Sequence, residues 1–150
     1  MSIQNRAVLQ QSLIHEIRRF IAGTILFNQK VADRFGLRLT DMQCLNVLDL
    51  LGPVTPGKLA ECTGLSTGGV TVMLDRLEKS GFIRREPNPI DRRSLLIRIN
   101  ARKMKKVHPL YEEINAQLDR FLGEISPSDL KSVVAFFTQM NAMRSGDLKP

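Results

Sequence analysis

The residues of this sequence that are best equipped for chemistry are its arginines and lysines, and they gather in one stretch. Eleven basic and three acidic residues lie between Arg76 and Lys106, which gives this segment a net charge of +8, whereas the rest of the chain sums to −1. A merely solvated surface mixes the two signs more evenly, so such a local excess favours binding to a polyanion. We expect nucleic acid as the partner; an anionic membrane surface or a simple gain in solubility are the alternatives.

Two short motifs resemble nucleotide-binding or catalytic signatures without meeting their requirements. Gly52–Lys58 has the glycine and lysine spacing of a phosphate-binding loop, but Leu59 follows where a hydroxyl residue would hold magnesium. Ser128 and Lys131 have the spacing of a serine nucleophile and its lysine base, but they stand at the start of a predicted helix, where a capping role is expected. No nucleophile and base can be assembled, so we expect no enzyme activity.

Two cysteines and two histidines are too few and too scattered for a metal site. Cys44 falls on the apolar arc of a predicted helix and is expected in the core. Cys62 follows Lys58 by four residues, and a nearby lysine lowers the pKa of a thiol, which leaves oxidant sensing as an alternative role. His15 and His108 lie on separate predicted helices. We therefore expect no metal, no cofactor and no disulfide, as is typical of a reducing compartment.

The elements that position the basic segment begin with two short helices. Thr55 and Pro56 form an N-cap followed by a proline at the first helical position, and Gly64 ends that helix. Ser66 caps a second helix that reaches Ser80 and has its apolar residues on one arc. Two short helices joined by a tight turn have the dimensions of a helix-turn-helix.

A β-hairpin is predicted directly after these two helices. Residues 82–86 and 94–99 have the character of strands, and the turn-rich loop 87–93 joins them. A hairpin in this place is a wing, and this one carries arginines near its tip. Residues from about 40 to 100 therefore form a winged helix-turn-helix lobe that could bind DNA.

Amphipathic helices flank this lobe on both sides. A first long helix carries apolar residues at helical spacing up to residue 35, and Thr40 with Gln43 forms a capping box at the start of the next helix. After the hairpin, Asn100 caps a single predicted helix that contains both the remaining basic residues and a long apolar stripe, and Ser126 caps the last helix. The predicted fold class is mainly α (α+β).

The flanking helices are too apolar to be buried by one small lobe. We expect a single domain over residues 1–150, in which residues 1–36 and 101–145 are N- and C-terminal dimerisation helices of a twofold homodimer. Two recognition helices would then face successive major grooves, about 34 Å apart. The sequence predicts neither a signal peptide nor a membrane span, so we expect a cytoplasmic protein without membrane contact.

The order of these elements resembles that of the MarR (multiple-antibiotic-resistance regulator) family of bacterial transcription factors. The matching segments are residues 39–43, 59–60, 64–66, 70–83 and the wing signature at 91–94. The resemblance implies that the helix from Ser66 to Ser80 enters the major groove, and that Arg93, whose guanidinium is held in place by the Asp91 carboxylate, reaches the minor groove or its phosphates. It also implies a regulator, more a repressor than an activator, that binds a pseudo-palindromic operator as a homodimer and catalyses no reaction.

Together the residue pattern and the resemblance define the expected DNA contacts. They are the caps of three helices, the exposed face of the recognition helix and the wing tip: Thr40, Thr55, Ser66, Thr67, Gly68, Thr71, Val72, Arg76, Asp91, Arg92 and Arg93. Val72 and Gly69 stand where family members often carry long polar and hydroxyl side chains, which supports an alternative, a winged-helix protein-interaction module with weak or no DNA binding. The family further implies a small aromatic or phenolic effector, bound between the dimerisation helices and the lobe.

Overall fold

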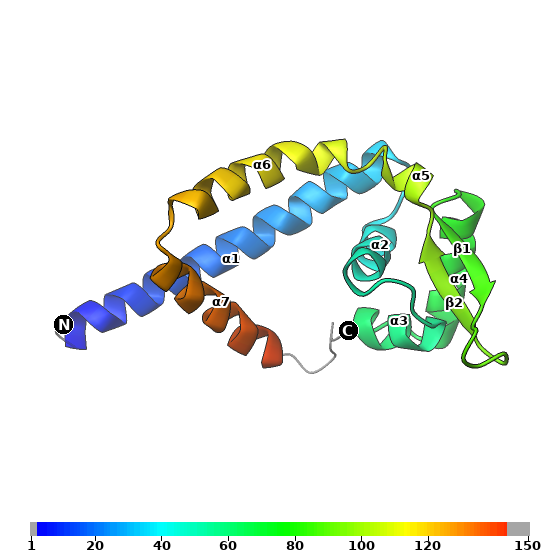
Figure 1. Ribbon diagram of the computed structural model, residues 1–150, viewed down its shortest axis with the longest axis horizontal. Coiled ribbons are helices and arrows are strands. Elements are labelled where there is room, and N and C mark those ends of the chain that lie inside the picture. The colour runs from blue at the N-terminus through cyan, green and yellow to red at the C-terminus, as the bar shows by residue number, and fades with distance from the viewer. Residues whose placement is uncertain (1–2, 144–150) are drawn as a thin grey trace. The chain divides into compact units, whose positions relative to one another are not determined.

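The computed structural model describes residues 3–143, which are mainly helical with one two-stranded sheet (Figure 1). In chain order the elements are α1 (Ile3–Arg34), α2 (Leu39–Leu51), α3 (Pro56–Thr63), α4 (Thr67–Lys79), β1 (Ile83–Pro87), β2 (Leu95–Ile99), α5 (Ala101–Met104), α6 (Pro109–Glu124) and α7 (Pro127–Ala142). The predicted mainly α (α+β) class is confirmed. The chain divides into two compact units, residues 1–42 and 43–150. Within the described part, no helix is both long and apolar enough to cross a membrane.

The first unit consists mainly of α1, the predicted long helix, which runs from Ile3 to Arg34 without a break at Gly23. The turn after it closes where the Leu37 amide donates to the Ala32 carbonyl oxygen at 2.9 Å. Large apolar side chains are exposed along most of the helix: Val8, Leu9, Leu13, Ile14, Phe20, Ile21, Ile25 and Leu26. Such a continuous apolar surface is unusual for a helix that stays in water, and it is expected at an interface.

The start of α2 differs from the prediction. The helix already begins at Leu39, so Thr40 lies inside its first turn and does not cap it. Instead the buried Asp41 carboxylate accepts a hydrogen bond from the backbone amide of Arg38 at 2.9 Å. This is the reciprocal half of a capping box placed two residues earlier, because an acidic side chain three residues into the helix reaches back to the cap position. The predicted capping box of Thr40 is therefore wrong.

The second unit contains the winged lobe, in which α3 and α4 form the helix-turn-helix. Thr55 and Ser66 cap these helices as predicted: the Thr55 hydroxyl accepts from the Lys58 amide and the Ser66 hydroxyl from the Gly69 amide, each at 3.2 Å. Gly64 between the helices has a φ of 69°, a left-handed conformation that is strained for residues with a side chain. Local sequence signals thus fix the turn that sets the direction of α4.

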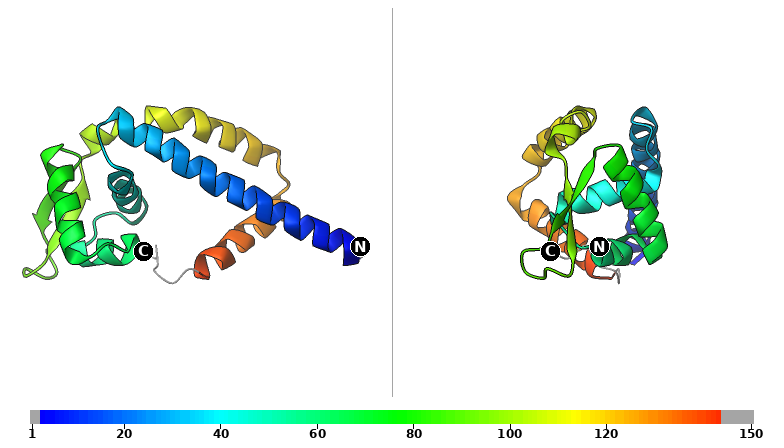
Figure 2. Two further views of the ribbon diagram at one scale, coloured as in Figure 1. Left: turned by 180° about the vertical axis from the view of Figure 1, so that it is seen from behind. Right: turned by 90° about the vertical axis from the view of Figure 1, so that its right-hand side faces the viewer.

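The core of the lobe lies among α3, α4 and the hairpin, which contact one another (Figure 2). The inward residues of α4 recur at steps of three and four, and they are at most 1% exposed: Val70, Met73, Leu74 and Leu77. Buried residues of the neighbouring elements complete this core: Leu59, Phe82, Ile83 and Ile97. Full burial of a large apolar side chain contributes about 1.5–3 kcal/mol. The core therefore holds α4 in one orientation against the hairpin.

Each strand of the hairpin begins one residue later than predicted, and the strands pair antiparallel with Ile83 opposite Ile99. Gly81 and Phe82 lie in the closing turn between α4 and β1. Gly81 has a φ of 76°, and the Phe82 amide donates to the Leu77 carbonyl oxygen at 2.9 Å, the pattern of a Schellman motif. This closing turn places β1 directly beside the helix that precedes it.

The single helix predicted after Asn100 is two helices. Asn100 does cap α5, since its side-chain oxygen accepts from the Arg102 amide at 3.1 Å, but α5 ends at Met104. The next helix, α6, begins at Pro109. Proline has no amide hydrogen to continue the hydrogen bonds of a helix and is favoured at a first helical position. The prediction of one continuous helix is therefore wrong, and the basic run 102–106 covers α5 and the turn after it.

α6 and α7 have no buried residue, although both are amphipathic. Their exposed large apolar side chains are Ile114, Leu118, Phe121, Val133, Val134 and Phe137. These helices make up most of the predicted C-terminal dimerisation segment 101–145; its residues 144–145, like residues 1–2 of the N-terminal segment, lie outside the described residues. Like α1, these helices expose an apolar surface that a second copy of the chain could cover.

Candidate nucleic-acid interface

α4 turns one face to solvent, and the candidate DNA-reading residues lie on it. The exposed residues of the helix are Thr67, Gly68, Thr71, Val72, Asp75 and Lys79. Arg76 is half-buried beside them. Because the opposite face is fixed by the core, this orientation follows from packing, and the orientation predicted from residue spacing is confirmed. A helix exposed in this way has the dimensions to enter a DNA major groove.

The N-terminal turn of α4 offers backbone amides to an anion. The Ser66 carbonyl oxygen accepts the first intrahelical bond, from Val70 at 2.9 Å, and the Ser66 hydroxyl accepts from Gly69. The amides of Thr67 and Gly68 come earlier in the helix than either of these donors, so they have no partner in the helix. Unpaired amides at a helix N-terminus, together with the partial positive charge of the helix dipole, favour a phosphate oxygen. Ser66 therefore shapes this turn, and the amides that follow it can bind.

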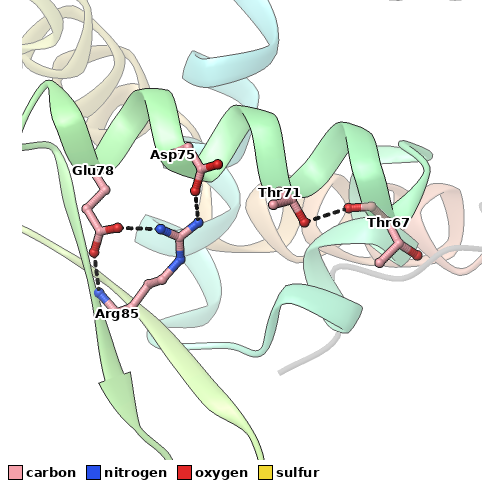
Figure 3. A network of polar contacts seen from close by, with 5 residues as sticks. All are labelled: Thr67, Thr71, Asp75, Glu78 and Arg85. Atoms are coloured by element: carbon pink, nitrogen blue, oxygen red, sulfur yellow. Dashed lines mark hydrogen bonds and ion pairs between the residues drawn. The ribbon is translucent and has the colours of Figure 1, made fainter.

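Thr71 and Val72 give the exposed face of α4 a mixed polar and apolar character. The Thr71 hydroxyl donates to the Thr67 carbonyl oxygen at 3.0 Å, so its proton is occupied and its oxygen can still accept a hydrogen bond (Figure 3). Val72 is 60% exposed and offers only methyl groups. Methyl groups in the major groove suit the C5-methyl of thymine, but they make no hydrogen bond to a base.

Two further candidate DNA contacts, Thr40 and Thr55, lie at the starts of α2 and α3 and are half-buried. Thr55 uses its hydroxyl to cap α3, and Thr40 lies in the first turn of α2. Thr40 belongs to the first compact unit, whereas Thr55 belongs to the second unit together with α4 and the hairpin. The structure thus brings the candidates on α3, α4 and the wing into one unit.

Hydrogen bonds within the loop give the wing tip a defined shape. The Asn88 side-chain amide donates to the Ser94 hydroxyl at 2.8 Å, and this hydroxyl donates to the Asp91 carbonyl oxygen at 3.0 Å. The Asp91 carboxylate accepts from the backbone amide of Arg93 at 3.0 Å, so it orients Arg93 through the backbone and not, as predicted, through the guanidinium. Arg92 and Arg93 are exposed, and no ion pair holds either within residues 3–143. Their positive charges are therefore available to a phosphate.

At the base of the wing, two arginines share one carboxylate. Glu86 pairs with Arg84 Nε at 2.6 Å and with Arg98 Nε at 2.8 Å. Arg84 lies directly opposite Arg98 in the strand register, where like charges repel. The hydrogen bond from Arg98 and the charges of both arginines lower the pKa of Glu86 below its ordinary value, against a smaller opposing effect of desolvation. This cluster stabilises the hairpin and leaves less free charge here than the composition indicates.

Arg85 on β1 joins the wing to the recognition helix (Figure 3). Its guanidinium pairs with Asp75 Oδ1 at 2.6 Å and with Glu78, and its backbone amide donates to Glu78 Oε1 at 3.2 Å. Partial burial acts to lower the pKa of Arg85, but hydrogen bonds and charge from the two carboxylates outweigh it and the pKa is raised. The sequence prediction missed this bridge. Its only local signal is the three-residue spacing of Asp75 and Glu78, which puts both carboxylates on one side of a helix.

An exposed helix face, an anion-binding helix start and a wing with two unpaired arginines together define a winged helix-turn-helix of the DNA-binding class. The MarR family model matches residues 37–95, from two residues before α2 to the start of β2. YcgE of Bacillus subtilis (strain 168), an uncharacterised HTH-type transcriptional regulator, is 34% identical over 137 residues, which cover 91% of this chain and 89% of that protein. The multiple antibiotic resistance protein MarR of Salmonella typhimurium is 37% identical over 60 residues, 40% of this chain and 42% of that protein.

Solved structures have the same fold. A MarR-family transcriptional regulator from Silicibacter pomeroyi superposes with a TM-score of 0.67 and 22% sequence identity over 89% of this chain and 90% of that one. The chain belongs to the MarR family of transcription regulators. It is accordingly a DNA-binding protein and not an enzyme.

Proposed function

We propose that this regulator is a repressor that binds a pseudo-palindromic operator as a homodimer in the cytoplasm. The observation that carries the proposal is the placement of two DNA-binding devices on one lobe: the exposed face of α4 and the unpaired Arg92 and Arg93 of the wing. Since the core and Arg85 hold α4 against β1, both devices approach DNA as one rigid surface. The recognition helix would occupy a major groove while the wing arginines follow the adjacent minor groove, where guanidinium groups bind well.

The homodimer is supported by the apolar surfaces that each unit leaves exposed. On α6, Ile114, Leu118 and Phe121 follow helical spacing, and they are 45%, 50% and 60% exposed. Apolar area removed from water contributes roughly 25 cal/mol per Å². A second copy of the chain supplies an equal apolar surface, so a twofold interface can bury both at once. The two lobes of such a dimer would match the two halves of a pseudo-palindrome.

Duplex binding tests the proposal, with the operator first selected from genomic fragments. Arg93→Ala should weaken binding to the selected fragment by about 1–3 kcal/mol and to unrelated DNA by a similar amount, because phosphate contacts position the protein without reading sequence. Thr71→Ala should instead change the ranking of related sites. Arg120→Ala on α6 removes the same charge from an exposed site outside the lobe and serves as the control. Equal affinity of the Arg93→Ala variant and the unaltered protein at fixed salt would contradict the role of the wing.

We also propose that a small aromatic or phenolic acid releases the protein from DNA. Within the second unit, a depression of about 450 Å³ is lined by Leu48, Ile99, Asp49 and three arginines. Two of these, Arg84 and Arg98, already share Glu86, so the exposed Arg102 is the one we expect to bind the carboxylate of the effector. This volume suits a small molecule, and guanidinium groups bind carboxylates well. Titration of the protein–DNA complex with 4-hydroxybenzoate should release the DNA, and Arg102→Gln should raise the concentration needed. If DNA release were the same for the unaltered protein and the variant, this placement of the effector would be wrong.

A further inference from the structure

Asp75 is the one acidic residue on the exposed face of α4. Its side chain is 62% exposed, and it follows Thr71 by one helical turn on the same face. A carboxylate on a surface that meets DNA repels the phosphates, and removing it would strengthen unspecific binding. Besides its ion pair with Arg85, a residue that opposes general affinity in this position can give a preference for particular bases.

The Asp75 carboxylate is held in place from one side only. The Arg85 guanidinium pairs with Asp75 Oδ1 at 2.6 Å, and the same guanidinium also pairs with Glu78. The Arg85 side chain is 23% exposed and Asp75 is 62% exposed, so the pair is anchored in the lobe at the arginine and open to solvent at the carboxylate. Among the residues that the structure describes, no hydrogen bond to Oδ2 of Asp75 is found. Oδ2 of Asp75 is therefore a fixed hydrogen-bond acceptor on the exposed face of α4.

The geometry points to Asp75 as a base-reading residue that accepts a hydrogen bond from the amino group of cytosine, with Arg85 as the positioning residue that fixes it. Cytosine itself presents only an N4 amino donor in the major groove, which suits a carboxylate. Guanine and thymine present acceptor oxygens, which repel a carboxylate, and adenine places its N7 acceptor next to its amino group. The inference rests on the proposed DNA binding by α4.

A contact between Asp75 and cytosine would add the base discrimination that the other exposed residues of α4 do not provide. The Thr71 hydroxyl donates its hydrogen bond to the Thr67 carbonyl oxygen, and the side chain of Val72 makes no hydrogen bond. Both can contact thymine, but neither rejects a wrong base strongly, because a missing methyl contact leaves no polar group unpaired. A carboxylate fixed by Arg85 adds a directional contact, and its loss leaves the Oδ2 acceptor without a donor. Discrimination at one base pair in each half-site is the consequence.

Selection of binding sites from a randomised duplex library tests the inference on the 150-residue chain. The unaltered protein should select cytosine at one position in each half-site, by about 5- to 30-fold over the other bases, which corresponds to one good contact. Asp75→Ala should lose this preference and bind unrelated duplexes more tightly. Asp75→Asn should shift the preference at the same position toward adenine, since asparagine matches the donor and acceptor of that base.

Variants of Arg85 separate positioning from folding. Arg85→Lys keeps the charge but cannot bridge two carboxylates with a planar fork, so it should weaken the cytosine preference while thermal unfolding shows a folded lobe. Lys79→Ala on the same exposed face is the matched control and should lower affinity for all sequences alike. If Arg85→Lys lowers the unfolding temperature but leaves the base preference intact, the positioning role is refuted.

Two failures are distinguishable. If the unaltered protein selects no duplex at all, the proposed function is wrong and this inference fails with it. If the unaltered protein selects a site and Asp75→Ala selects the same bases at every position, only the role of Asp75 is overturned. Retention of the cytosine preference by Asp75→Asn together with its loss in Asp75→Ala would support an acceptor contact and refute the need for a charge.

Discussion

The two adjacent glycines of α4 offer a matched pair of substitutions with different expected outcomes. A Cβ at Gly68 would meet no atom within 4 Å, whereas a Cβ at Gly69 would lie 3.3 Å from the Ser66 hydroxyl oxygen. Alanine is more favourable than glycine in a helix by about 1 kcal/mol. Gly68→Ala should therefore stabilise the protein by up to about 1 kcal/mol, a rise in melting temperature of about 2–4 °C for a chain of this size.

Gly69→Ala should give almost none of this gain. Its methyl group would press on the hydroxyl that accepts the Gly69 amide at 3.2 Å, and a lost N-cap costs about 1 kcal/mol. The two effects are of similar size and opposite sign. Thermal unfolding followed by circular dichroism, at one fixed protein concentration because a dimer is expected, measures the difference between the two variants.

DNA binding by the same pair tests why Gly68 is a glycine. Gly68 is exposed on the face proposed to meet DNA, whereas Gly69 is half-buried. If the backbone approaches DNA closely, the added methyl of Gly68→Ala should weaken operator binding by about tenfold, equivalent to 1.4 kcal/mol, in spite of the higher stability. A Gly68→Ala variant that is less stable than the unaltered protein would refute the reasoning on stability, and one that is more stable and binds DNA equally well would refute the close approach.

Three further outcomes are expected. Leu59→Ala should destabilise the lobe by about 2–5 kcal/mol in urea unfolding, because Leu59 is fully buried in its core; a loss below 1 kcal/mol would contradict the assignment of the core. Ser66→Ala should cost about 1 kcal/mol and raise the hydrogen-exchange rate of the Gly69 amide more than that of the Leu77 amide, whereas equal changes would argue against a cap. Since the pKa of Glu86 is lowered by Arg98, its contribution to stability is present above the ordinary value of 4.5 and is lost as the pH falls through the lower folded value. Glu86→Gln should therefore flatten the pH dependence of unfolding below pH 4.5, and an unchanged acid limb would refute the pairing.

Local signals in the sequence predicted the helix-turn-helix well. The caps Thr55, Ser66 and Asn100 were correctly predicted because a hydroxyl or amide side chain before a helix acts on an amide two or three residues away. The inward face of α4 followed from its apolar spacing, since the same residues that repeat with the period of a helix must meet the core. Both inferences depend on neighbours in the chain alone.

The errors come from competition between local signals. At the start of α2, Thr40 could act as an N-cap and Asp41 could accept a hydrogen bond from the cap residue. The buried Asp41 makes its bond, and the helix begins at Leu39. After Asn100, the apolar stripe continues across Pro109 with helical spacing, so periodicity hides the break that the missing proline amide imposes. Because Pro109 has no amide hydrogen, the helix is interrupted before it although the apolar spacing continues.

The candidate site was predicted in its parts but not in its connections. Exposed positions on α4 and the wing arginines were correctly placed on the surface, whereas the bridge from Arg85 to Asp75 and Glu78 was missed. This bridge joins a helix to the strand that follows it, and side-chain direction across such a turn depends on the tertiary contact. For the same reason, the charge count overestimated the free positive charge, because it could not show which arginines are paired.

The salt dependence of duplex binding tests the central claim most directly. The logarithm of the association constant for the selected operator should fall linearly with the logarithm of the salt concentration, with a slope of about −0.9 per neutralised phosphate. Replacing both Arg92 and Arg93 by alanine should make this slope shallower by roughly one unit for each phosphate contact removed. A chain that ignores duplex DNA at low salt, or a double variant whose slope equals that of the unaltered protein, would contradict the account.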